Sequence, residues 1–457
     1  MSEGDVGSVS DGAGVSQQRN HGDNTVAYID QASYTALRAL GRGPVIQFTW
    51  IYDRGVDLDG LRGLARNLDR TMLGRRLERS PLPFGRHRWV SGPGPADIEV
   101  MAATRPRAGV WKWVAERSVV PVDPERGPVW HVAVQPLAEG GDAVSLVVSD
   151  AGGIIGSIAD AVAGRARDLG YPPPRSRRPG AALRQDLAAT MRTLSQVPAA
   201  ILGAVRVARE QQTGSAGAAP AVSPARTDEI ADVPTLAVRA DLAEFDRVAS
   251  ALGGTRNVLF AAVAARLGHR MGRVDAGGRA MLSFPVSERT EGDVTGNALN
   301  TITVLADPKA VLGDLGGLRR DLKQALVRMA DSRATMAAPL PLTPFVPRLL
   351  VRRVEKMVLK VGQPIGCSNI GELPPAVNRP DGTDADYFDA RMTEPGVTAA
   401  EFAGRGGHLW LAVAFLRDRM SLSVASWRVS GPNSAAALAD TVRAAFADFG
   451  LSAAVEY

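Results

Sequence analysis

The residues with the clearest chemical meaning lie in segment 143–162, which reads AVSLVVSDAGGIIGSIADAV. An apolar run predicts a buried strand that stops at Ser149-Asp150, before a Gly-Gly turn and a helix beginning near Ile154. Folds commonly place reacting groups at such a point, where a buried strand ends ahead of a turn. Asp150 is the acid here and becomes the candidate catalytic residue. No histidine lies beside it in the sequence.

Removing a proton from a hydroxyl or amine substrate needs a base. A positioned histidine contributes about 10²–10⁴-fold to the rate because its pKa lies near neutrality. A carboxylate with an ordinary pKa of about 3.9 is a much weaker base. Two interpretations of Asp150 stay open. It is either a base whose pKa is raised by burial, or a structural carboxylate that caps the helix from Ile154 or pairs with Arg289.

Four other polar residues are candidates for lining the same site: Arg289, Asn297, Ser368 and Asn369. Arg289 can pair with Asp150 or with the acids beside it in SERTEGD. Asn297 follows a glycine, so turn chemistry alone also explains it. Ser368 and Asn369 can donate hydrogen bonds to a reacting carbonyl, or they form a tight loop.

The histidines and the single cysteine exclude several other classes of site. Five histidines are scattered without ligand spacing, and one cysteine, Cys367, allows no disulfide and no zinc cluster within the chain. His131 lies opposite the apolar residues of its strand, so it faces solvent or a cleft. His131 and His408 are the alternative bases, whereas His87 and His269 lie among arginines and are predicted at the surface.

Length and composition indicate a two-domain globular protein. A chain of 457 residues, 45% hydrophobic and 22% charged, is long enough for two cores of roughly 200 residues each. The net charge of +5 comes from scattered arginines. This scatter argues against a clustered basic surface for nucleic acid, whereas the positive charge suits a small acidic partner. The start of the sequence has no apolar signal region, and no run approaches the length of a transmembrane helix. We therefore expect a cytoplasmic protein.

Helical and strand patterns alternate in two similar halves, which predicts an α/β fold with mixed sheets. The Gly-, Ala-, Ser- and Pro-rich stretch TGSAGAAPAVSPAR at 213–226 is the best linker. The predicted division is a disordered tail at 1–27, one half at 28–212, the linker, and a second half at 227–457. A cleft is expected between the halves. The segment 344–360, from Pro344 to Lys360, is apolar and basic, so it is either a core helix with a solvated edge or a contact with a membrane surface.

Four stretches of the sequence resemble the chloramphenicol-acetyltransferase-like superfamily, which includes condensation domains and wax-ester synthase/diacylglycerol acyltransferases. They are ALGGTRNVLFAAVAARL at 251–267, FPVSERTEGDVTGN at 284–297, GCSNIGEL at 366–373, and the strand pair at 128–148 with its glycine turn. The resemblance implies two acetyltransferase-like halves with a tunnel at their interface. It also implies that Asp150 lies near Ser368 and that Arg289 makes an ion pair at the site.

The chain departs from this superfamily at its His-His-x-x-x-Asp-Gly motif. The corresponding stretch is shortened and has neither histidine, and Asp150 stands where either the motif's His or its Asp belongs. The resemblance implies an acyltransferase-like protein with no bound cofactor. Its donor is acyl-CoA or an acyl carrier thioester and its acceptor a lipid alcohol or amine, with catalysis impaired by the missing base. The alternative is a non-catalytic lipid- or acyl-CoA-binding scaffold that partners a lipid or polyketide synthase. The sequence does not predict an oligomeric state.

Overall fold

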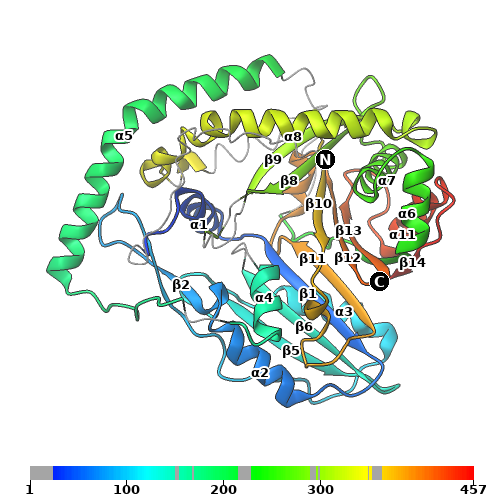
Figure 1. The fold of residues 1–457 in the computed structure, drawn as a ribbon, viewed down its shortest axis with the longest axis horizontal. Helices are drawn as coiled ribbons and strands as arrows, with labels where there is room; N and C mark the ends of the chain where they lie inside the picture. The colour runs from blue at the N-terminus through cyan, green and yellow to red at the C-terminus, as the bar shows by residue number, and fades with distance from the viewer. Residues whose placement is uncertain are drawn as a thin grey trace, which may run out of the picture.

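The structure is a computed structural model that describes residues 24–149, 154–166, 169–214, 228–288, 295–296, 299–347, 349–351 and 363–457. Two sheets form its frame, one in each half, and helices cover their faces (Figure 1). The expected mixed α/β architecture of two halves is confirmed. Of the expected tail at 1–27, only residues 24–27 are described, and among them Val26 is fully buried.

The first half follows the predicted alternation. Its elements are α1 (Tyr28–Leu40), β1 (Val45–Tyr52), α2 (Leu58–Leu68), β2 (Arg75–Glu78), β3 (Arg88–Ser91), β4 (Glu99–Val100), α3 (Val110–Ser118), β5 (Trp130–Pro136), β6 (Asp142–Ser149), α4 (Ile154–Val162) and α5 (Pro179–Gly214). Asp57 caps α2 as its sequence position predicts, because its side chain accepts hydrogen bonds from the backbone of Asp59 and Gly60. The predicted hairpin of β5 and β6 is confirmed.

The second half contains β7 (Thr235–Asp241), α6 (Leu242–Ala251), α7 (Arg256–Arg270), β8 (Ala280–Ser287), β9 (Leu299–Ala306), α8 (Gly316–Ala337), the 3-10 helix η4 (Leu340–Phe345), β10 (Ile365–Glu372), β11 (Tyr387–Thr393), α10 (Ala399–Gly404), β12 (His408–Leu416), β13 (Arg419–Trp427), α11 (Ala435–Ala447) and β14 (Ala454–Glu456). Its sheet has the order β14-β7-β13-β12-β10-β8-β9. The helices α6, α7 and α11 pack on one face of this sheet and form the larger core.

One strand of the second half joins the sheet of the first half. The first sheet has the order β11-β1-β6-β5-β4, and β11 pairs antiparallel with β1 from Ile51–Tyr387 to Val45–Thr393. On its other side β11 meets the second sheet, where the Ser421 hydroxyl donates a hydrogen bond to the Phe388 carbonyl. The two halves are therefore joined through β11, which the sequence analysis did not predict as a strand.

Two helices differ from their predicted extents. The helix predicted from Ile154 to about residue 169 ends at Val162, shortly before Gly164 adopts a positive φ of 64°. Pro198 predicts an interruption of the helical stretch 181–212, but the helix continues through this proline as α5. Figure 1 shows α5 running up one side of the molecule and bending over toward α8. A bend is the usual effect of a proline inside a helix, because proline removes one backbone hydrogen bond.

The linker at 213–226 leads to a prediction for limited proteolysis. Residues 213 and 214 belong to α5, and 215–227 lie outside the described residues. The composition of the linker predicts that a protease cuts there first. Because β11 is hydrogen-bonded to β1, the two fragments should stay together in size-exclusion chromatography under native conditions. A first cut within 143–162, or fragments that separate without denaturant, would contradict the proposed division.

Candidate functional site

The candidate site is built on the end of β6. Ser149, the last residue of β6, is buried, and its backbone N–H donates to the Val129 carbonyl at 3.0 Å. The Ser149 hydroxyl is buried without a hydrogen-bond partner among the described residues. Asp150, the expected catalytic residue, lies outside the described residues, as does Arg289. Their expected ion pair and the expected closeness of Asp150 to Ser368 therefore stay predictions.

The face of the first sheet that carries Ser149 is unusually polar for a buried surface. In register along this face, Gln47 lies opposite Arg391, and Thr49 lies between Asp389 and Ser145. All five side chains are buried. Helix α3 covers them, since the Gln47 amide donates to the Val114 carbonyl at 2.8 Å and to the Ser145 hydroxyl at 2.9 Å.

A buried ion pair lies at the centre of this polar face. Arg391 approaches Asp389 through Nε at 2.9 Å and Nη2 at 2.8 Å, and the two side chains are 3% and 0% exposed. The Arg391 guanidinium also lies over the Trp111 ring, 4.8 Å from its centroid. Burial raises the pKa of Asp389, although Arg391 acts against that shift. Both residues of the pair lie on β11, and Arg391 contacts the first half through Trp111 of α3.

Several polar atoms on this face have no hydrogen-bond partner among the described residues. They include Gln47 Oε1, Thr49 Oγ1, Ser149 Oγ, Asp389 Oδ1, Thr393 Oγ1 and His131 Nδ1. Buried polar atoms are ordinarily satisfied by protein, water or a ligand. This face supplies hydroxyl and amide groups beside the end of β6. It also carries His131 of β5, which lies in register with Val147.

Ser368 and Asn369 lie in the middle of β10. This segment therefore forms a strand and not the tight loop that was the alternative. Side chains alternate along a strand, and Cys367 belongs to the core under α7, so Ser368 faces the first half. The Asn369 side chain accepts a hydrogen bond from the Gly371 backbone at 3.0 Å, across a bulge. Pairing of β10 with β8 is confined to Ile365 and Gly366. Ser368 thus lies where these two strands have separated.

Of the neighbouring residues Gly296 and Asn297, the structure describes only Gly296. The Gly296 backbone donates to Asp30 of α1 at 2.8 Å, and a side chain at this position would meet the same carboxylate at 2.9 Å. Gly296 of the second half is therefore held against α1 of the first half. Asn297 lies outside the described residues.

The four described histidines are all packed against protein groups. His131 contacts Glu99 at 3.1 Å, and burial lowers its pKa. Burial lowers the pKa of His408 to about 4, and its ring packs on Phe402. His87, which was predicted at the surface, is partly buried against Tyr34, and burial lowers its pKa to about 4. His269 is also partly buried. A base with a pKa near 4 is poorly matched to catalysis at neutral pH.

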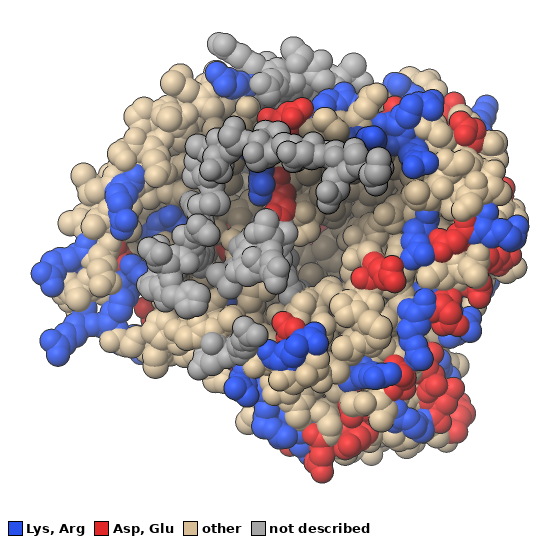
Figure 2. Space-filling model, viewed as in Figure 1, with Lys and Arg blue, Asp and Glu red and all other residues tan. Residues whose placement is uncertain are grey.

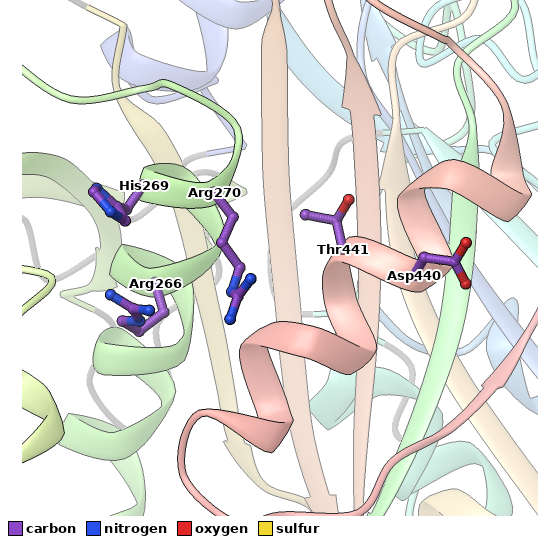
Figure 3. A pocket seen from close by; sticks show the side chains of 5 residues that line it. All are labelled: Arg266, His269, Arg270, Asp440 and Thr441. Atoms are coloured by element: carbon purple, nitrogen blue, oxygen red, sulfur yellow. The ribbon is translucent and has the colours of Figure 1, made fainter.

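A recess of about 450 Å³ lies away from this site, between α7 and α11. Its lining includes Arg266, His269 and Arg270 (Figure 3). Both arginines are already paired with Asp448, and α7 and α11 cover the side of the second sheet that faces away from β11. We therefore assign no role in the candidate site to this recess. Within the described ranges, no cluster of His, Cys, Asp and Glu could hold a metal ion.

The predicted tunnel between the halves stays a prediction. Figure 2 shows a hollow near the middle of the molecule's face, between the positions of α8 and α4 in Figure 1. The buried polar character of Ser149 was not predicted from the sequence, and neither were Asp389 and Arg391 as members of the site. The alternation of YFDARMT at 387–393, apolar at Phe388, Ala390 and Met392, is a strand signal that could have revealed β11.

Comparison with solved structures shows the fold of this chain. The first condensation domain of the calcium-dependent antibiotic synthetase aligns with a TM-score of 0.54 at 14% identity, covering 95% of this chain and 98% of that domain. Polyketide synthase associated protein 5 from Mycobacterium tuberculosis aligns with a TM-score of 0.50 at 14% identity, covering 90% and 96%. The epimerization domain from the third module of tyrocidine synthetase B aligns at 0.52 and 14%, covering 94% and 96%.

No protein-family model matches the chain, and no curated protein matches it by sequence. The chain has the two-lobed, chloramphenicol-acetyltransferase-like fold of condensation domains, as the sequence resemblance predicted. At these identities the likeness establishes the fold and not the reaction.

Proposed function

We propose that this protein binds an acyl thioester, either acyl-CoA or an acyl carrier thioester, between its two halves and transfers the acyl group slowly or not at all. The fold supports the binding part of the proposal, because it is shared with condensation domains over nearly the whole chain. The acceptor would be a lipid alcohol or amine. The pI of about 9.6 suits the phosphates of such a donor.

The observation that carries the impaired catalysis is the end of β6. The chain has Ser149-Asp150 there. Among the described histidines, His131 lies on the same sheet face, and the pKa values of His87, His131 and His408 are all lowered. A hydroxyl acceptor would therefore lack an efficient base, at a cost of about 10²–10⁴ in rate. Hydrogen-bond donors such as Ser368 could still polarise the thioester carbonyl.

The second candidate function is a non-catalytic scaffold that holds a lipid or acyl-CoA for a lipid or polyketide synthase. The pairing of β11 with β1 favours it, because this pairing joins the two halves through their backbones and involves no catalytic group. A scaffold and an impaired enzyme differ in residual turnover, which a direct assay measures.

A thioester-release assay with long-chain acyl-CoA and a fatty alcohol or diacylglycerol should show turnover far below the usual enzyme range of about 1 s⁻¹ or more. Asp150→Ala should change the melting temperature more than it changes any residual rate. His131→Ala and His408→Ala should leave the rate per folded molecule unchanged. Turnover near 1 s⁻¹ that Asp150→Ala abolishes would overturn the proposal and assign Asp150 as an unusual base.

A further inference from the structure

The helix α5 carries large apolar side chains on the side that faces away from the protein. Seven of them are 43–72% exposed: Leu183, Leu187, Met191, Leu194, Ile201, Leu202 and Val205. We call this set the apolar stripe. Surface helices ordinarily turn their apolar face toward the core. Single exposed leucines need no explanation, but contiguous apolar surface above a few hundred Å² marks an interaction site.

The members of the apolar stripe are contiguous on the helix. From Leu183 to Leu194 they recur every three or four residues, and the exposed Pro198 continues the series to Leu202 and Val205. At 3.6 residues per turn, these positions fall within an arc of about 100° and extend along about 33 Å of helix. The stripe therefore follows one side of α5 and continues through the bend of the helix (Figure 1).

A narrow, partly polar seam holds α5 against the protein and fixes the stripe outward. Its buried residues are seven positions apart: Asp186, Thr193 and Ala200. Asp186 accepts hydrogen bonds from Ser80 at 2.8 Å and from Arg177 at 2.7 Å. Thr193 contacts the Tyr28 hydroxyl at 3.1 Å. Asp186 and Thr193 therefore face the protein, whereas the apolar stripe faces outward.

The charges beside the apolar stripe are basic. The exposed charged residues of α5 with described side chains are Arg184, Arg192 and Arg206, and they fall along one flank of the stripe, while Asp186 is buried. Two further exposed arginines, Arg175 and Arg178, precede the helix. Along the edge of the molecule where α5 runs in Figure 1, Figure 2 shows blue and tan side chains outermost. An apolar stripe with an arginine flank matches the acyl boundary and phosphate layer of an anionic bilayer.

Two further exposed leucines follow an element that packs against α5. The 3-10 helix η4 packs against α5, and the residues that follow it include Leu349 and Leu350, which are 73% and 45% exposed. They belong to the segment 344–360 that the sequence suggested as a membrane contact, most of which lies outside the described residues.

No described helix alone is long and apolar enough to cross a membrane, although α6 and α7 meet that test as a pair bent by 86°.

We propose that α5 docks this protein on an anionic phospholipid bilayer, with the apolar stripe at the headgroup–acyl boundary and its arginines on lipid phosphates. The undescribed parts of the sequence fit the stripe less well. Residues 1–23 offer valine as their only branched apolar residue, and residues 352–362 carry basic side chains that the arginine flank would repel. The proposal does not depend on the proposed acyl thioester function.

Vesicle flotation with the full chain tests this proposal. The protein should bind vesicles of phosphatidylcholine and phosphatidylglycerol in about equal amounts more tightly than vesicles of phosphatidylcholine alone, and added salt should weaken the binding. The double variant Leu187→Ser, Leu202→Ser should bind at least about tenfold more weakly. Val119→Ser is the matched control, because Val119 is 63% exposed at the end of α3, and it should bind like the unaltered chain. Unchanged melting temperatures exclude unfolding as the cause.

A fluorescent label separates insertion of α5 from other modes of attachment. The native Cys367 is fully buried, and burial raises the pKa of its thiol, so a cysteine introduced by Leu194→Cys can be labelled selectively with a polarity-sensitive dye. The emission should shift to the blue on anionic vesicles, and the same label at Val119→Cys should not respond. No binding to anionic vesicles, binding that the double variant leaves intact, or stripe-dependent self-association without vesicle binding would each overturn the proposal.

Discussion

Asp389→Asn is expected to destabilise the protein by about 3–5 kcal/mol, the usual cost of removing one partner from a buried ion pair. The substitution leaves the Arg391 cation buried, stacked on Trp111, without its counter-ion. Because β11 joins the halves through β1, we expect the urea midpoint of both halves to fall together. Tryptophan fluorescence against urea concentration measures this shift.

The companion variants make the ion-pair prediction specific. Asp389→Leu combined with Arg391→Met should recover much of the lost stability, since apolar pairs of similar volume often replace buried ion pairs without cost. Asp160→Asn removes a mostly exposed pair with Arg165 and should leave the midpoint unchanged. If Asp389→Asn unfolds at the same urea concentration as the unaltered chain, the ion pair does not hold the halves together.

Acidification from pH 6.5 to about 4 is expected to remove roughly 3 kcal/mol of stability for each of His87 and His408. Burial is the main reason that both pKa values fall from 6.5 to about 4, and neighbouring arginines add to the lowering. A histidine with a lowered folded-state pKa binds fewer protons folded than unfolded. Its contribution is therefore fully present above pH 6.5 and is lost as pH falls toward 4. Each pH unit between the unfolded and folded pKa values corresponds to about 1.4 kcal/mol.

A variant that cannot titrate identifies the source of this pH dependence. His408→Leu keeps an apolar contact with Phe402 but cannot take up a proton, so the urea midpoint should fall less between pH 6.5 and 4.5 than it does in the unaltered chain. Burial raises the pKa of Asp389, which acts in the opposite direction, so the comparison is made between variants at each pH. An unchanged pH profile in His408→Leu would contradict the assignment.

Local patterns in the sequence predicted most of the individual elements. The alternation of β5 and β6 and the glycines between them identified the hairpin, and Gly140 and Gly141 indeed have positive φ values of 96° and 82°. The break predicted at Pro198 was wrong, because packing of Thr193 and Ala200 on either side holds α5 as one helix despite its proline. Tertiary contacts override a local rule in this case.

The candidate site was harder to predict because its polar face depends on distant pairing. From their residue types alone, Asp389 and Arg391 would be expected at the surface. They are buried because β11 pairs with β1, which lies more than three hundred residues earlier in the sequence. Ser368 could be recognised from its resemblance to a family motif, since that motif is local. The sequence pattern identified Ser149 as the end of a strand. That its hydroxyl is buried without a hydrogen-bond partner among the described residues depends on the elements that cover the first sheet.

Native mass spectrometry with palmitoyl-CoA tests the central claim most directly, because it reports binding and the fate of the thioester together. The chain should form a one-to-one complex in which the thioester stays intact after prolonged incubation with a fatty alcohol. Ser368→Phe, which places a large side chain on the face of β10 turned toward the first half, should lose the complex without a lower melting temperature. The absence of any complex, or conversion of the bound thioester at about 1 s⁻¹ or faster, would contradict the account.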